Sequence, residues 1–362
     1  MVLLLSFLIT FGKRKGIRSQ YRKLSKITDN SGIIVCFIMS VALVYSVIEG
    51  SLTGIGIAYL ALSLEIIYTA VFVIAWAIEW VINNFAKYAV RSVGYMEKYI
   101  EGNKAAWEEA FENRDASWGA DITERIQKED YPFFNEETKS VLKKIDTNGA
   151  VIGQFCCNNG RELLSLVKCG NAKKGIGFDI AENQVAFANE KAKELDLPCV
   201  FEAVNIYDID DRYKEQFDVV LITIGALCWF DDLDRFFAVI SKCMKPGAVI
   251  VINEQHPCTN MLAADGEEVF EPDHRKECHY SYFEHEWTGN GGMYYMTQKS
   301  YHSKTFTDYT HSMSEIITGM CNNGIVITGM KEFDTDISGG FHPIDHSGFP
   351  LSMILQGQKT GV

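Results

Sequence analysis

The sequence predicts an α/β domain built on a mostly parallel sheet, and three observations predict it. Between residues 150 and 255, short apolar runs alternate with helical segments of roughly ten to fifteen residues, an order typical of βαβ units. The apolar runs lack polar alternation, as strands do when both faces of their sheet are covered. Turn signals such as Lys245-Pro246-Gly247 separate the segments.

Each element follows from its own pattern. Apolar runs predict strands at 150–157, 175–180, 199–206, 217–227 and 248–255. Amphipathic segments predict helices at 161–170, 182–195 and 233–244. Upstream, apolar residues at helical spacing among many Glu and Lys predict a helical region from 95 to 145. Residues 256–312 are rich in aromatic side chains and His, and they alternate like antiparallel strands; a helix at 311–324 and a strand at 325–333 follow.

Composition limits the class of protein. The chain has 362 residues and a formal net charge of −13, and the acidic excess lies in residues 83–362. An acidic domain disfavours binding to nucleic acid, which needs a basic face. The ten cysteines include no CxxC pair and are too dilute for a disulfide scaffold. We therefore expect reduced thiols in the cytosol.

The N-terminal part differs in kind from the rest. Residues 1–30 form a basic arm with seven Lys or Arg, residues 32–48 carry no charge, and residues 55–78 carry only Glu65. Because a membrane helix needs about 20 apolar residues, with about 17 as the lower limit, residues 31–85 predict a membrane-spanning helical hairpin. The positive-inside rule then leaves both the arm and the acidic domain in the cytoplasm. The alternative is a pair of buried helices in a soluble cytoplasmic protein.

Three strand ends in the predicted sheet carry polar or small residues. The turn from Cys156 to Gly160 follows the first strand, Asp179 ends the second, and Asn205 with Ile206 ends the third. Ligands of open parallel sheets bind beyond these carboxyl ends, and an acid at the second strand suits two ribose hydroxyls. Taken singly, the same residues are ordinary turns and helix caps. Together they indicate a nucleoside-containing cofactor, and the single glycine in the turn disfavours a dinucleotide such as NAD.

These segments carry a resemblance to a known family. GQFCCNNGRE, GFDI, VNIYDI, FDVVLITIGAL and CMKPGAVIVI stand in the order of the motifs of class I S-adenosylmethionine-dependent methyltransferases that act on small molecules, which the chain resembles. Gln154 replaces the usual acid of the first motif, Cys156 and Asn158 replace its first two glycines, and Asn205 stands where Asp is common. Binding through backbone atoms tolerates these changes if φ stays negative in the turn, and Asn also enters left-handed conformations at modest cost.

The resemblance implies an architecture and a set of site residues. It implies a Rossmann-like sheet with an antiparallel final strand, a helical cap at 92–148, and a methyltransferase domain at 149–362, with a cofactor core at 150–255 and a substrate-side insertion at 256–312. The implied activity is in-line methyl transfer from S-adenosylmethionine to a small-molecule or lipid-like acceptor. The implied cofactor-binding residues are Phe155, Cys156, Asn158, Gly160, Asp179, Ile180, Asn205, Ile206, Ile224 and Gly225.

Catalytic and metal-binding residues are less clearly marked. His256, directly after the fifth strand, is a candidate general base, although a structural histidine before Pro257 fits the sequence equally. His and Cys residues between 256 and 285 match no zinc-ligand spacing, so no metal is expected. Two other functions remain open: a non-catalytic module with the same fold, and a nucleotide-dependent oxidoreductase. Cofactor binding distinguishes them from the methyltransferase.

Overall fold

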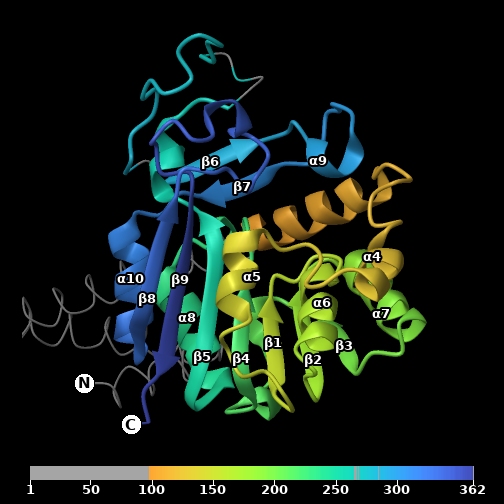
Figure 1. Ribbon diagram of the computed structural model, residues 1–362. Coiled ribbons are helices and arrows are strands. Elements are labelled where there is room, and N and C mark those ends of the chain that lie inside the picture. Colours follow the sequence, from red (N-terminus) through yellow and green to blue (C-terminus); the bar gives the residue numbers. More distant parts are fainter. Residues whose placement is uncertain (1–97, 265–266, 268, 284, 362) are drawn as a thin grey trace, which may run out of the picture. The chain divides into compact units, whose positions relative to one another are not determined.

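The computed structural model describes residues 98–264, 267, 269–283 and 285–361 (Figure 1). Within these residues, seven strands form one sheet in the order β3-β2-β1-β4-β5-β9-β8. β1 to β5 pair in parallel, whereas β9 runs antiparallel between β5 and β8. The strands are β1 Val151–Phe155, β2 Lys174–Asp179, β3 Cys199–Ala203, β4 Phe217–Ile222, β5 Met244–Gln255, β8 Ile325–Phe333 and β9 Ser352–Lys359.

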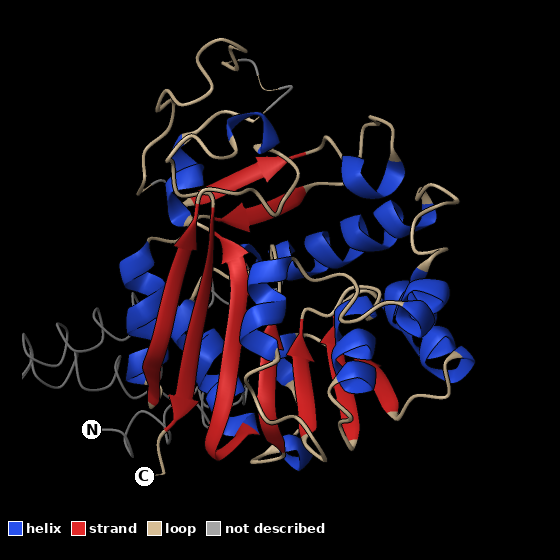
Figure 2. Cartoon of the chain, viewed as in Figure 1, coloured by secondary structure: helices blue, strands red, loops and turns tan. Residues whose placement is uncertain are grey.

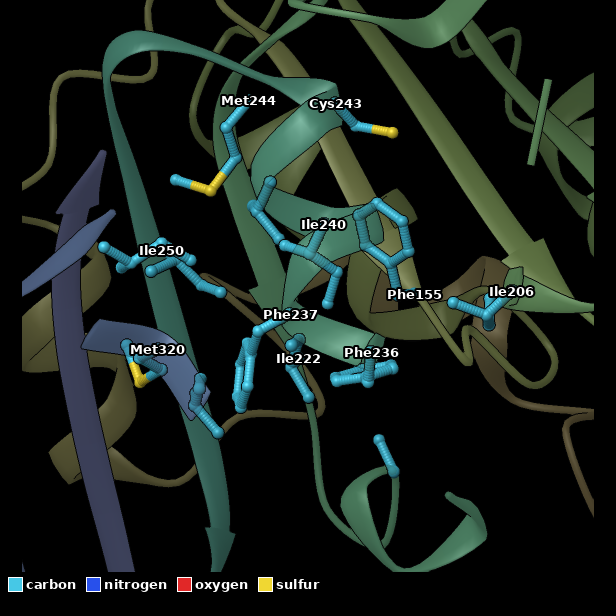
Figure 3. Packing of buried hydrophobic residues seen from close by; sticks show 14 of the residues in the cluster. Phe155, Ile206, Ile222, Phe236, Phe237, Ile240, Cys243, Met244, Ile250 and Met320 are labelled. Carbon is cyan, nitrogen blue, oxygen red and sulfur yellow. The ribbon is translucent and has the colours of Figure 1, made fainter. Parts of the chain in front are cut away.

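Helices cover both faces of this sheet (Figure 2). One face packs against α4 Ile122–Lys128, α5 Glu136–Leu142, α6 Arg161–Cys169 and α7 Glu182–Glu194. The other face packs against α8 Leu233–Cys243 and α10 Met313–Asn322. Figure 3 shows this second core, in which Phe237 and Ile240 of α8 lie near Ile222 of β4 and Met320 of α10. Burial on both faces explains why the strands are apolar without alternation.

A smaller layer lies over the carboxyl ends of the parallel strands (Figure 1). It contains the helical residues 98–112, the antiparallel pair β6 Glu286–Gly289 and β7 Phe306–Tyr309, and the short helix α9 Tyr294–Thr297. The buried Asn103 side chain joins two of these parts, because its Nδ2 donates to the carbonyl oxygen of Thr307 and its Oδ1 accepts from the Thr307 N–H, both at 2.7 Å. Segments far apart in sequence thus cover the end of the sheet where ligands bind.

Most of the predicted elements are present, and the parallel sheet with an antiparallel final strand is confirmed. Three strands are shorter than expected, and the strand at 150–157 is β1, which covers only Val151–Phe155. The strand at 217–227 ends at Ile222, and that at 199–206 ends at Ala203. After Ala203 the Asn205 side chain accepts from the Tyr207 N–H at 3.1 Å, which turns the chain into the 3₁₀ helix Ile206–Asp208. The alternation in 256–312 is also misleading, because residues 294–297 form α9 rather than a strand.

The membrane prediction concerns residues that the structure does not describe. The basic arm at 1–30 and the apolar hairpin at 31–85 both lie outside the described ranges. Within those ranges, none of the helices has the length and apolar character needed to cross a bilayer. The membrane anchor and the cytoplasmic location therefore stay predictions.

Candidate active site

A cavity of about 340 Å³ opens at the carboxyl ends of the parallel strands. Its size falls in the range of small-molecule sites. Strand ends and the segments after them form part of the lining, namely Cys156, Asn158, Asn159, Asp179, Ile180, Asn205, Ile206, Ile224, Gly225, Trp229 and Phe230. The covering layer adds Tyr99, Asn103, Trp107 and Tyr295, and Trp118 and Gln184 also line the cavity.

Asp179 is the acidic group at the end of β2. Its Oδ2 accepts from the backbone N–H of Asn158 at 2.8 Å, and its Oδ1 accepts from that of Ala181 at 3.0 Å. Burial raises the pKa of the Asp179 carboxyl, and these backbone hydrogen bonds oppose the rise by favouring the charged form. The two bonds fix the carboxylate at the cavity wall and leave lone pairs for further donors.

The turn between β1 and α6 has a left-handed backbone at three positions. The φ angles are 57° at Cys156, 49° at Asn158 and 76° at Gly160. The condition of negative φ is therefore met at neither Cys156 nor Asn158, although Asn enters this region at modest cost. The turn directs the Asn158 N–H at Asp179, and this sharp reversal needs backbone conformations that glycine adopts most easily. At Gly160 no side chain fits, because an added Cβ would lie 2.5 Å from the Phe201 ring.

Buried side-chain amides at the cavity wall offer unused hydrogen-bonding atoms. Among the described residues, Asn159 Nδ2 and Gln184 Oε1 are buried and have no hydrogen-bond partner, and both side chains belong to lining residues. Gln154 Nε2 donates to Thr223 Oγ1 at 3.0 Å, while its Oε1 also lacks a partner there. Unpaired buried polar atoms cost free energy, and those of Asn159 and Gln184 belong to side chains that line the cavity.

Glu254 at the end of β5 holds the turn that follows β4. Its carboxylate accepts from the backbone N–H groups of Gly225 at 2.5 Å, Ala226 at 3.0 Å and Leu227 at 3.3 Å. The side chain is 6% exposed, and burial raises the pKa of its carboxyl against the pull of these hydrogen bonds. Glu254 thus positions the loop from which Ile224 and Gly225 face the cavity.

The covering layer supplies an aromatic wall. The Trp107 ring lies 5.3 Å from Trp229 and 5.5 Å from Phe306, measured between centroids, with edge-to-face angles. At one side the Tyr99 hydroxyl donates to Asp231 Oδ1 at 2.9 Å. Among the described lining residues Arg161 is the one cation, and its Nε lies 2.7 Å from Glu162 Oε1. The wall is therefore apolar and close to neutral.

The structure brings eight of the ten predicted cofactor residues to the cavity: Cys156, Asn158, Asp179, Ile180, Asn205, Ile206, Ile224 and Gly225. The other two do not line it. Phe155 is fully buried in the core, with its ring 5.3 Å from that of Phe178. Gly160 packs under Phe201 as the first residue before α6.

His256, the predicted general base, also lies away from the cavity lining. Its Nε2 is 2.8 Å from Glu332 Oε1, and its Nδ1 accepts from the Cys258 N–H at 3.1 Å. The ring is 5% exposed. Because both nitrogens bind protein groups, the geometry favours the structural alternative for this histidine.

Sequence reasoning missed several residues of the site. Tyr99, Asn103 and Tyr295 come from segments with no motif, and only the tertiary fold brings them to the strand ends. Gln184 gave a weak signal, because it lies in the first turn of the helix that follows Asp179. The role of Glu254 also had a signal, since a charged residue within an apolar strand needs partners when it is buried.

Comparison with known proteins agrees with this geometry. Residues 147–303 match a family model described as "Methyltransferase domain". The comparison with curated proteins gave no match.

Similar solved structures include an S-adenosylmethionine-dependent methyltransferase from Listeria monocytogenes, with 20% identity, a TM-score of 0.47, and coverage of 61% of this chain and 97% of that chain. Another is geranyl diphosphate C-methyltransferase from Streptomyces coelicolor A3(2), with 13% identity, a TM-score of 0.47, and coverage of 72% and 98%. These distant likenesses add no argument to the match of the family model. Residues 147–303 of the chain thus carry the sequence pattern of a methyltransferase domain.

Proposed function

We propose that the protein binds S-adenosylmethionine in this cavity and transfers its methyl group to a small, uncharged and largely apolar molecule. The observation that carries the proposal is the Asp179 carboxylate, held at the cavity wall by two backbone N–H groups with lone pairs left over. A carboxylate so placed suits the paired hydroxyls of a ribose. The unpaired amides of Asn159 and Gln184 add donors and acceptors for the polar parts of the same ligand.

The lining residues suit the three parts of the cofactor. Asp179 would accept hydrogen bonds from the ribose, Ile180 and Ile206 would pack against the adenine, and Asn205 would lie beside the base. The turn at Cys156 and Asn158 would lie against the methionine part. The cofactor supplies a methyl group on a sulfonium, which is a good leaving group. The chain's own contribution is to hold the acceptor in line with that methyl and to exclude water.

The aromatic residues of the lining indicate the class of acceptor. They include Trp107, Trp118, Trp229 and Phe230, and the lining residue Arg161 is already paired with Glu162. A highly anionic acceptor would find no free cation among the described lining residues, whereas an apolar or aromatic one would bury its surface against the indole rings. A lipid-like acceptor rests on the predicted hairpin at 31–85, which the structure does not describe.

Asp308 on β7 is the proposed proton acceptor for an acceptor molecule that must lose a proton. It shares a strand face with Phe306, whose ring packs against the lining residues Trp107 and Trp229. Burial raises the pKa of the Asp308 carboxyl to about 6. A carboxylate with a pKa near neutrality is suited to general base catalysis.

Calorimetric titration of the full chain with S-adenosylmethionine tests the proposal, with NADH as the control ligand. We expect saturable binding of S-adenosylmethionine alone, and a loss of at least roughly tenfold in affinity for Asp179→Asn, because an amide cannot accept from all the donors that surround it. Asp273→Asn is the matched control, since Asp273 is exposed in a distant loop. Binding of neither ligand to the wild type would overturn the proposal and favour a non-catalytic module.

A further inference from the structure

A cluster of three side chains outside the cavity has the composition of a metal site. The ligand atoms of His285, His311 and Glu315 all lie within 4.8 Å of one another. His285 directly precedes β6, His311 follows β7, and Glu315 is in the first turn of α10. The sequence spacing of these residues gave no signal, because three separate elements bring them together.

The surroundings of His311 prepare its ring for coordination. The side chain is 6% exposed, and its Nε2 lies 2.8 Å from the carbonyl oxygen of Phe230. A carbonyl can only accept, so Nε2 carries the proton of the neutral ring and Nδ1 carries a lone pair. Metal-binding histidines commonly donate their other N–H to a carbonyl in this way, which fixes the tautomer and the ring orientation.

Glu315 is also held in place, by hydrogen bonds from Ser312. Its Oε2 accepts from the Ser312 N–H at 2.7 Å and from the Ser312 hydroxyl at 2.8 Å, as part of a capping box at the start of α10. A carboxylate has about four lone-pair sites, so these two hydrogen bonds leave capacity for a cation. The capping box thus orients the carboxylate toward the two histidines without occupying all of its lone pairs.

His285 provides the exposed side of the cluster. Its ring centroid lies 5.4 Å from that of Tyr309 and 5.8 Å from that of His311, and its backbone carbonyl accepts from the Thr310 N–H at 2.9 Å. The backbone bond fixes the residue, while the exposed ring can turn toward an incoming ion. An open side gives the ion an entry path.

We propose that His285, His311 and Glu315 bind a divalent ion of the zinc class, which joins the β6–β7 pair to α10. Two imidazoles and one carboxylate are ligands that zinc takes in proteins, with bonds of about 2.1 Å and neighbouring ligand atoms about 3.4 Å apart in a tetrahedral site. Binding an ion would bring the three ligand atoms, which lie within 4.8 Å of one another, closer together. Because His311 also binds the carbonyl of Phe230, a lining residue, the ion steadies one wall of the cavity.

The test uses the full chain without a histidine tag, stripped of metal by a chelator and dialysed. Calorimetry with Zn²⁺ is expected to show one more equivalent of tight binding in the wild type than in His285→Ala, with a weakening of at least roughly 100-fold at that site. Zn²⁺ should raise the Tm of the wild type and not that of the variant. His285 is exposed and its side chain makes no hydrogen bond with the described residues, so the variant keeps its fold.

Two further variants keep the result interpretable. His302→Ala removes another exposed histidine of the same region and should bind Zn²⁺ as the wild type does. His285→Cys supplies a different zinc ligand and should restore binding that the alanine variant loses. Equal stoichiometry, affinity and Tm response in the wild type and His285→Ala would overturn the proposal, whatever the outcome of the cofactor titration.

Discussion

The β1–α6 turn shows that residues other than glycine can adopt the backbone conformation that glycine favours. Cys156 and Asn158 stand where the resembled family has glycines, and both adopt positive φ as a glycine would. Such a conformation costs about 1–2 kcal/mol for a residue with a Cβ. The hydrogen bonds that Asp179 accepts from Asn158 and Ala181 offset part of that cost. Gly160 is retained because Phe201 leaves no room for a Cβ.

The buried carboxyl group of Asp308 is expected to make the stability of the protein depend on pH. Its carboxyl has a pKa of about 6 in the folded protein against an ordinary value of 3.8, because burial disfavours the charge. The folded protein therefore holds this proton more tightly than the unfolded chain does. The contribution of Asp308 to the free energy of unfolding is fully present below pH 3.8 and is lost as the pH rises through 6. Asp308→Asn should raise the free energy of unfolding at pH 7.5 by up to about 3 kcal/mol, measured by urea denaturation.

The same variant should differ little from the wild type near pH 4, where both carry a neutral side chain. Asp273→Asn, at an exposed position, is the control and should show no such pH-dependent gap. A gap of the same size at both pH values would contradict the assignment of the raised pKa to Asp308.

At the scale of elements, one carboxylate sets the course of a whole loop. β4 ends at Ile222, and the chain then turns because Glu254 on the neighbouring strand β5 accepts from three successive backbone N–H groups. The sequence of 217–227 is mostly apolar, and Gly225 is its local signal of this turn. A side chain of the neighbouring strand therefore determines where the loop that lines the cavity begins.

Glu254→Gln tests that arrangement. The amide carries a donor in place of one acceptor oxygen, and this donor would face backbone N–H groups in a buried place. We expect the free energy of unfolding to fall by about 1–3 kcal/mol, together with weaker binding of S-adenosylmethionine. Glu190→Gln on the exposed side of α7 is the matched control and should leave both unchanged. Unaltered stability and affinity in Glu254→Gln would contradict the role given to this carboxylate.

At the scale of the whole molecule, the cavity joins the sheet to its covering layer. Asn103 of the helical segment binds Thr307 of β7, and both parts face the strand ends. A ligand that contacts both sides should therefore stabilise the folded protein as a unit. At 100 times its dissociation constant, S-adenosylmethionine should add about 2.7 kcal/mol to the free energy of unfolding.

Thermal unfolding of the full chain measures this effect. The Tm should rise with the concentration of S-adenosylmethionine in the wild type, and it should rise much less in Asp179→Asn at the same concentrations. NADH should leave the Tm of both unchanged. A shift of equal size in the wild type and Asp179→Asn would show that the ligand binds without this carboxylate.

The sequence by itself determined the parallel sheet, its helices and the strand ends that line the cavity. These are local properties: apolar periodicity marks each strand, and in a parallel sheet the carboxyl ends of the strands meet at one edge. Asp179, Asn205 and the turn at Cys156 could thus be placed together from their positions in the chain. The antiparallel final strand came from the resemblance to the family.

Only the tertiary structure decided which residues complete the cavity and which distant groups meet. Tyr99, Trp229 and Tyr295 share one cavity although more than a hundred residues separate the first from the others. His285, His311 and Glu315 converge from three elements, a juxtaposition without a spacing rule. His256 follows β5 directly, yet Glu332 of β8 engages its ring. Packing of the whole core sets these contacts, because local sequence patterns do not determine which distant segments meet.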